Sequence, residues 1–275
     1  MKIEQLAINA ISTRHSGLVE CLDAYAAAGF KHIEFPLWEV KAYLGEGHTP
    51  TDARQLLNER GLDCIGGWET SVQCFGPGDK RKANRQLLLE NAQLLGELGG
   101  TNMVCGTDGP AEGESCDDPL TALAEGFGKA AELIAPTGVT ILLEFNWSPI
   151  VKSLRTAAEV ARRSRKENVG IIFDPAHYHC TPSKFEQLTP ENVATIRHVH
   201  VDNMADKPGE LSDCNGDRVL PGAGGCLDLK ALFGRLEECG YVGYFSIEMF
   251  SEELWSLPAE QAAKIMYQSL LTLVD

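Results

Sequence analysis

Four segments of the sequence end in side chains of the types that bind divalent metal ions. Apolar runs lead into Glu144 in the sequence LLEFN and into Asp174 in IIFDPAH. His200 lies in HVHVD, and Glu248 lies in YFSIEMF. A carboxylate at the end of an apolar run is costly to bury unless it is paired or bound to a cation. Three converging carboxylates repel one another strongly without such a cation, so these residues predict a shared metal site.

No lysine or arginine lies within these four segments to neutralise the carboxylates. Three carboxylates and one imidazole form a hard, oxygen-rich ligand set. Such a set suits one Mn²⁺, Mg²⁺ or Co²⁺ ion, and Zn²⁺ or Fe²⁺ also fits it. Each residue taken singly has a structural alternative, because a buried carboxylate is more often salt-bridged and a lone histidine more often belongs to the core.

Further residues near these segments are candidates for substrate binding. His177 comes three residues after Asp174 and is expected to contact substrate, with a structural histidine as the alternative. Arg218, in GDRVLPGAG, is the only cation that a motif places nearby. It predicts a contact with a substrate oxygen, with a salt bridge at the rim as the alternative. Trp68 and Trp147 predict an apolar wall for the C–H faces of a sugar, against core packing.

Four other residues have roles that the sequence leaves open. Alternate residues of a strand face the same way, so His198 is expected one layer below His200, in the core or beside a ligand. Asp202 follows the same strand and either orients a ligand or caps the next turn. His179 is a candidate for substrate binding or for the surface. Trp38 either joins the aromatic wall or packs in the core.

All these residues belong to a regular alternation of strand and helix patterns. The expected strands cover residues 6–12, 32–36, 62–68, 101–106, 139–145, 169–173, 198–201 and 244–249. The expected helices cover residues 17–29, 51–60, 82–98, 119–135, 153–167, 190–196, 227–239 and 259–274. Eight such units predict an α/β fold, a (β/α)8 TIM barrel forming a single domain over residues 1–275, rather than an open doubly wound sheet. Active sites of such barrels lie at the carboxyl ends of the strands, where the candidate residues are expected.

The composition and net charge of the chain disfavour nucleic acids and membranes as binding partners. The chain has 275 residues, of which 44% are hydrophobic and 23% charged, as in a globular protein with a large core. Its net charge of −15 disfavours nucleic acid. No apolar run approaches the ~18 residues of a membrane-spanning helix, and no signal peptide is visible. Nine cysteines without a CxxC pair fit reduced thiols. We therefore expect a cytoplasmic protein with no nucleic-acid or membrane partner, and leave a homo-oligomer open.

The ordered motifs LLEFN, FDPAH, HVHVD, GDRVLPGAG and YFSIEMF resemble those of the xylose-isomerase-like TIM barrel superfamily, also described as the sugar phosphate isomerase/epimerase family. The early GFKHIEFP resembles its second strand, so the resemblance covers essentially the whole chain. Members include sugar epimerases and isomerases, inosose dehydratases and dehydroshikimate dehydratases. The resemblance to the ketose 3-epimerase branch implies metal ligands and two substrate contacts. The implied ligands are Glu144, Asp174, His200 and Glu248, and the implied contacts are His177 and Arg218.

Two positions depart from branches of this superfamily. Ketose 3-epimerases carry a second glutamate six residues after the first ligand, where this chain has Ile150. That departure argues against strict ketose 3-epimerase activity. The apurinic endonuclease branch has a histidine after the Asp-Arg pair, where this chain has Val219. That difference and the negative charge argue against DNA as a substrate.

The leading hypothesis is a metal-dependent isomerase or epimerase of a small polyhydroxy ketone or aldehyde, such as a sugar or cyclitol. The metal would polarise the carbonyl and acidify the neighbouring C–H. Glu144 and Glu248 would remove the proton and return it from opposite sides. The alternative is a metal-dependent dehydratase of the inosose or dehydroshikimate type, with His177 or His179 as general acid. A non-catalytic sugar-binding barrel would not need a charged four-ligand cage.

Overall fold

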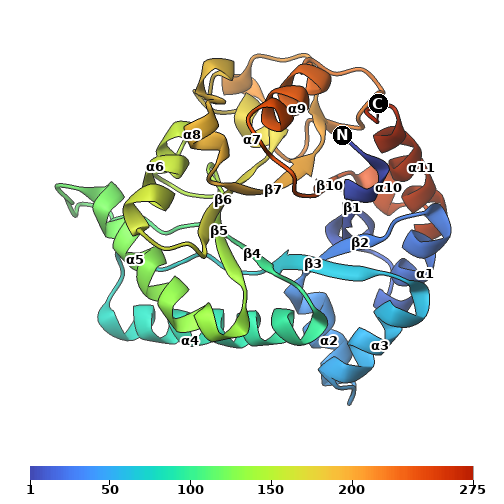
Figure 1. Cartoon of the computed structure of the whole chain (residues 1–275), viewed down its shortest axis with the longest axis horizontal. Coiled ribbons are helices and arrows are strands. Elements are labelled where there is room, and N and C mark those ends of the chain that lie inside the picture. The colour runs from blue at the N-terminus through green and yellow to red at the C-terminus, as the bar shows by residue number, and fades with distance from the viewer. Residues whose placement is uncertain (275) are drawn as a thin grey trace.

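Eight short runs of apolar residues pair side by side into a closed parallel barrel in the computed structural model, which describes residues 1–274 (Figure 1). The strands are β1 (Leu6–Asn9), β2 (His32–Pro36), β3 (Asp63–Trp68), β4 (Asn102–Cys105), β5 (Thr140–Leu143), β6 (Val169–Phe173), β7 (Ile196–Val201) and β10 (Phe245–Ile247). Neighbours in the chain are neighbours in the barrel, and β10 closes it by pairing with β1. The predicted TIM barrel is confirmed.

Helices surround the strands and cover their outer faces (Figure 1). The helices that follow the strands are α1 (Leu18–Ala28), α3 (Pro50–Arg60), α4 (Gly78–Leu98), α5 (Pro119–Ile134), α6 (Leu154–Ser164), α8 (Pro190–Val193), α9 (Leu229–Glu238) and α11 (Ala259–Leu271). Left-handed glycines end several of them, as the sequence predicts; Gly99, for example, follows α4 with φ of 94°. Three shorter helices are α2 (Leu37–Gly45), α7 (Pro175–His179) and α10 (Glu252–Trp255).

The core has an apolar layer outside the strands and a mixed interior. Buried side chains of the strands and helices form one large apolar cluster between them. Inside the barrel, Val104, Leu142 and Ile172 pack together with Trp68. Strands β2 and β7 instead contribute Glu34 and His198, each 1% exposed. The barrel interior is therefore apolar on one side and charged on the other, which is unlike a stack of branched apolar layers.

Several strands, among them the first, the fifth and the last, are shorter than predicted. The predicted strand 6–12 ends at Asn9, and Ala10–Thr13 forms a 3-10 turn, η2. The Asn9 side chain accepts a hydrogen bond from the Ile11 amide at 3.1 Å, and this bond turns the backbone out of the sheet. Strand β5 likewise ends at Leu143. Both changes place the next polar side chains at the barrel mouth.

Both candidate substrate contacts lie in short regular elements above the barrel rather than in irregular loops. His177 lies in α7 rather than in a loop, because Asp174 caps the helix and Pro175 occupies its first turn. Arg218 lies in a strand, β9 (Arg218–Val219), which pairs antiparallel with β8 (Asn203–Met204). Ile196 also begins β7 instead of ending the preceding helix. Helix α7 and the β8–β9 pair therefore fix where the side chains of His177 and Arg218 lie.

The lengths of the helices and the state of the cysteines bear on the expected absence of a membrane span and of disulfides. Within residues 1–274, no helix is both long enough and apolar enough to cross a membrane. All nine cysteines are free, and Cys21, Cys64, Cys74 and Cys105 are buried.

Candidate metal centre

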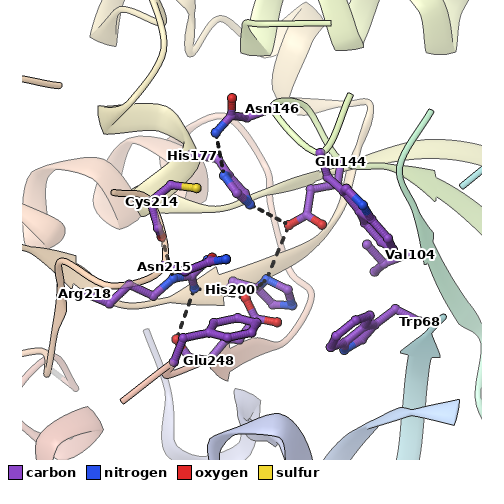
Figure 2. Close-up of a pocket in the computed structure, with 12 residues that line it drawn as sticks. Trp68, Val104, Glu144, Asn146, His177, His200, Cys214, Asn215, Arg218 and Glu248 are labelled. Atoms are coloured by element: carbon purple, nitrogen blue, oxygen red, sulfur yellow. Dashed lines mark hydrogen bonds and ion pairs between the residues drawn. The ribbon is translucent and has the colours of Figure 1, made fainter. Parts of the chain in front are cut away.

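The four predicted ligands lie together at the carboxyl ends of the strands. Glu144, Asp174 and Glu248 are the first residues after β5, β6 and β10, and His200 lies in β7. Their carboxylate oxygens surround His200 Nδ1, at 3.8 Å from Glu144, 3.3 Å from Asp174 and 3.2 Å from Glu248. Figure 2 shows Glu144 and Glu248 on opposite sides of the His200 ring. All four are less than a tenth exposed.

His177 lies beside these four residues, close enough to supply a ligand to the same metal ion. One donor atom each from Glu144, Asp174 and His177 lies within 4.8 Å of the others, as do donors from Asp174, His200 and Glu248. His177 Nε2 is 3.4 Å from Glu144 Oε1. The geometry therefore allows His177 either to face a substrate or to join the ligands.

Arg218 supplies the positive charge that the four strand segments lack. Its guanidinium lies 3.1 Å from Asp174, 2.6 Å from Asp202 and 2.9 Å from Glu248, and its side chain is fully buried. Burial opposes ionisation of Asp174, but Arg218 and then His177 hold the pKa of that carboxyl well below its ordinary value. The side chain predicted to meet a substrate oxygen is thus already engaged with two candidate ligands.

Two other contacts hold the ligand carboxylates in place. Asn9 Nδ2 donates a hydrogen bond of 2.7 Å to Glu248 Oε1, and its Oδ1 accepts one of 3.4 Å from Trp68 Nε1. The His177 backbone amide donates a bond of 2.8 Å to Asp174 Oδ1. Each of these carboxylates keeps its other oxygen toward His200, so the protein orients the donors before any ligand binds.

His177 is itself oriented by neighbours on the pocket wall. Asn146 Nδ2 lies 3.0 Å from its Nδ1, leaving Nε2 to face Glu144 (Figure 2). Burial by itself would lower the pKa of His177. The charge of Asp174 and contacts with Cys214 and Glu144 outweigh burial and raise that pKa well above its ordinary value. His177 is therefore able to present a proton at Nε2.

The pocket above the four ligands has a volume of about 310 Å³. Its twelve lining residues are Trp68, Val104, Glu144, Asn146, Trp147, His177, His200, Cys214, Asn215, Arg218, Glu248 and Phe250. The rings of Trp68 and Trp147 meet edge to face with centroids 5.9 Å apart. Gly106 permits the Trp147 backbone to approach, because a Cβ at that position would lie 2.4 Å from the Trp147 carbonyl oxygen.

Several sequence candidates lie outside the pocket lining. Trp38 is 42% exposed and packs on the outer side of Trp68, at 4.7 Å between ring centroids. His179 contacts the Lys207 carbonyl at 2.9 Å. Asp202 pairs with Arg218 beneath the pocket. Ile150 packs against the apolar core, so the position of the second epimerase glutamate carries no polar group here.

Sequence reasoning missed Glu34, Asn9 and Asn146. Glu34 is buried on β2 and its oxygens lie 2.9 Å from His200 Nε2 and 3.1 Å from His198 Nε2. The acidic residue inside GFKHIEFP was a signal, since a charge within an apolar strand needs a partner. For Asn146 the only signal lies in the structure and not in the sequence. Its backbone φ of 73° is uncommon for a residue other than glycine.

The donor set fits a divalent cation. The centre holds four buried carboxylates, those of Glu144, Asp174, Asp202 and Glu248. All but Glu144 contact the same guanidinium, that of Arg218. Burial and then the charge of Asp174 raise the pKa of Asp202 well above its ordinary value, so the cluster already resists further negative charge. Burial would lower the pKa of His200, but Glu248 and Glu34 outweigh it and raise that pKa. The centre thus favours added positive charge among oxygen-rich ligands.

Comparison with known proteins identifies relatives of the same architecture. A family model described as xylose isomerase-like TIM barrel matches residues 22–271. The chain is 33% identical to an inosose isomerase of Bacillus subtilis (strain 168) over 165 residues, 59% of this chain and 56% of that protein. It spans only about half the length of the inosose isomerases that it matches. It is 29% identical to a 3-dehydroshikimate dehydratase of Pseudomonas aeruginosa (strain PAO1) over 94% of this chain and 40% of that protein.

Solved structures repeat the fold over nearly the whole chain. A crystal structure of the IolI protein with a bound zinc atom has a TM-score of 0.87 at 23% identity and covers 98% of each chain. A D-allulose 3-epimerase from Methylomonas sp. in complex with D-allulose has a TM-score of 0.74 at 16% identity, covering 98% of this chain and 96% of that one. At these identities the likeness establishes the fold alone.

Proposed function

The chain belongs to the xylose isomerase-like TIM barrel family, and from this premise we propose that it is a divalent-metal-dependent isomerase or epimerase of a small polyhydroxy ketone or aldehyde. The observation that carries the proposal is the convergence of Glu144, Asp174 and Glu248 on His200 Nδ1 at the floor of a pocket. Relatives named inosose isomerase and inosose dehydratase support an enzyme of the isomerase or lyase class.

Glu144, Asp174, His200 and Glu248 would hold the metal, for which Mn²⁺, Mg²⁺ and Co²⁺ suit the donors and Zn²⁺ or Fe²⁺ is also compatible. When bound, such an ion supplies a Lewis acid that polarises a carbonyl and acidifies the C–H beside it. A zinc atom in the related IolI structure supports a divalent ion without deciding which one is native here.

The two glutamates would move the proton. Glu248 accepts hydrogen bonds from Asn9 and Arg218, at 2.7 and 2.9 Å. Glu144 has only longer contacts, of 3.4 Å with His177 and 3.8 Å with His200. Glu144 therefore keeps more of its lone pairs free and is the better placed group to remove a proton from carbon. Glu248 would then return the proton from the other side of the substrate.

The charge of the pocket favours an uncharged substrate. Among the twelve lining residues, Arg218 is the only lysine or arginine, and its guanidinium contacts Asp174, Asp202 and Glu248. A phosphate or carboxylate on the substrate would meet Glu144 and Glu248 with no lysine or arginine of the lining free to pair it. The volume of about 310 Å³ lies at the small end of ligand pockets. A neutral sugar or cyclitol ketone suits both the charge and the volume of the pocket, with Trp68 and Trp147 against its C–H faces.

Proton exchange tests this proposal directly. The metal-loaded protein is incubated in D₂O with inososes, unphosphorylated ketoses, ketose phosphates and 3-dehydroshikimate, and each mixture is followed by NMR. We expect deuterium at the carbon beside the carbonyl of a neutral substrate, together with an isomer or epimer. Faster turnover of the phosphorylated or carboxylated compounds would contradict the charge argument. Absence of exchange with every compound would contradict the proton-transfer chemistry.

A dehydratase is the second candidate, and the position of His177 favours it. His177 lines the pocket, faces Glu144 through Nε2, and has a raised pKa, so it can protonate a departing hydroxyl. Proton removal by Glu144 followed by loss of that hydroxyl as water would give an unsaturated product. The same NMR experiment separates the two outcomes, because dehydration removes a carbon-bound oxygen and produces an alkene or enol signal.

We also propose a cytoplasmic location, which rests on the cysteines. Nine residues of this type without a CxxC pair are typical of reduced thiols. Labelling of the native cells with a membrane-impermeant thiol reagent tests it, since Cys226 is exposed and would react if the protein were outside.

A further inference from the structure

A buried carboxylate below the pocket has no place in the proton transfer described above. Glu34 on β2 is 1% exposed, and its two oxygens lie 2.9 Å from His200 Nε2 and 3.1 Å from His198 Nε2. In the described part of the chain, no lysine or arginine forms an ion pair with it. Burying this charge requires a strong local reason, because an unpaired buried carboxylate is costly.

The position of Glu34 determines which nitrogen of His200 faces the ligand carboxylates. A neutral imidazole carries one N–H and one lone pair. His200 Nδ1 points at Glu144, Asp174 and Glu248, whereas Nε2 points at Glu34. Without a cation, the carboxylates at Nδ1 attract the same proton. Once a metal pairs with those carboxylates, the anion at Nε2 favours the proton on that nitrogen, and Nδ1 keeps the lone pair that a metal needs.

His198 completes the arrangement from the layer below. It contacts the second oxygen of Glu34 and packs edge to face on His200, with ring centroids 5.4 Å apart at 83°. Each oxygen of Glu34 thus lies at ion-pair distance from one ring nitrogen, and neither ring Nε2 has another hydrogen-bond partner among the described residues. Glu34 on β2 and His198 on β7 thus pack against the one ring of His200.

We propose that Glu34 is a positioning residue that holds His200 as the Nε2–H tautomer with Nδ1 toward the metal. This inference rests on the metal centre proposed above. It assigns a role to a residue that does not itself contact substrate. The alternative is that Glu34, His198 and His200 hold a second metal ion, since one donor from each lies within 4.8 Å of the others; metal stoichiometry separates these possibilities.

The test combines metal binding with NMR of the imidazole nitrogens. Zn²⁺ is titrated into metal-free wild type, Glu34→Gln and Ser246→Ala against a competing chelator. We expect one Zn²⁺ per chain in the wild type and about 10- to 100-fold weaker binding in Glu34→Gln, the usual loss when such a partner is removed. Ser246→Ala is the matched control, because Ser246 is buried and pairs in register with His200 on the neighbouring strand. It should bind Zn²⁺ like the wild type.

Long-range ¹H–¹⁵N spectra of the Zn²⁺-loaded wild type should show His200 with Nδ1 bound to metal and a slowly exchanging proton on Nε2. That spectrum tests the inference even if Glu34→Gln does not fold, and Glu34→Asp, which keeps the charge, should retain the tautomer. Metal on Nε2, two Zn²⁺ per chain, or unchanged affinity in Glu34→Gln would overturn the proposal. A wild type that binds no Zn²⁺, Mn²⁺ or Co²⁺ would instead overturn the metal centre itself.

Discussion

Replacing Arg218 by methionine should destabilise the metal-free protein strongly. Methionine keeps much of the length of the side chain but removes the guanidinium that contacts Asp174, Asp202 and Glu248. The side chain is fully buried, so solvent cannot replace those contacts. Removing one partner of a buried ion pair costs about 3–5 kcal/mol, because the remaining charge is left uncompensated. At about 2–4 °C per kcal/mol for a protein near this size, Tm should fall by about 6–20 °C.

The loss of stability in Arg218→Met should depend on metal and on pH. A divalent ion at Glu144, Asp174, His200 and Glu248 replaces the missing positive charge, so the rise in Tm on adding metal should be larger in Arg218→Met than in the wild type. Arg218 is the largest of the influences that lower the pKa of Asp174, ahead of His177 and His200, so its removal should let burial shift that pKa upward. A carboxyl with a raised native pKa binds its proton more tightly in the folded state. The deficit in stability is therefore largest at neutral pH and shrinks as pH falls.

Differential scanning calorimetry with and without metal, at pH 5.5 and pH 8, measures these effects. Arg163→Met is the control, since Arg163 forms only exposed ion pairs with Glu159 and Asp118 and should change Tm little. Circular dichroism verifies that each variant folds. The reasoning fails if metal-free Arg218→Met melts with the wild type at pH 8, or if metal stabilises the two proteins equally.

The other predictions concern catalysis and binding. Glu144→Gln and Glu248→Gln should each lose about 10²–10⁴ in kcat at saturating metal and stop taking solvent deuterium into substrate; turnover restored by excess Mn²⁺ would leave both glutamates as ligands only. His177→Ala should weaken substrate use while elemental analysis still finds one metal per chain, and loss of that metal would make His177 a ligand. Trp68→Ala and Trp147→Ala should raise KM for a neutral substrate more than they lower kcat, as steady-state kinetics will show; an unchanged KM would exclude both from the binding wall. Removing metal with a chelator should lower the unfolding free energy by about 3 kcal/mol relative to protein at a free metal concentration of 100 Kd, and thermal melts before and after metal is restored measure this difference.

The barrel and the meeting of the four candidate ligands at one end of it were predictable because their signals are local. Strand and helix periods, left-handed glycines and apolar runs each involve residues close together in the chain. Once eight strand–helix units imply a closed parallel barrel, the residue after each strand must lie at one end of it. Glu144, Asp174 and Glu248 could therefore be placed together without any knowledge of their contacts. The position of His177 was also open to local reasoning, since Asp174-Pro175 is a helix-starting pair.

The partners of those ligands could not be predicted in the same way. That Arg218 is buried depends on the β8–β9 hairpin, which brings it over Asp174 and Glu248. That Asn9 holds Glu248 depends on the pairing of the first strand with the last. Both contacts join residues far apart in the chain, and neither residue type is by itself a signal for its partner.

The sequence by itself determined the order of the strands, the end of the barrel that carries the chemistry, and four residue types suited to one divalent ion. Only the tertiary structure decided what surrounds them: the side of the barrel interior that is charged, the atom of His200 that faces the carboxylates, and the contact between Glu34 and that ring. The physical reason is the distance along the chain between the residues that interact. Hydrogen bonds that start and stop elements act over a few residues, whereas barrel closure and strand register determine which distant side chains lie within 3 or 4 Å of each other.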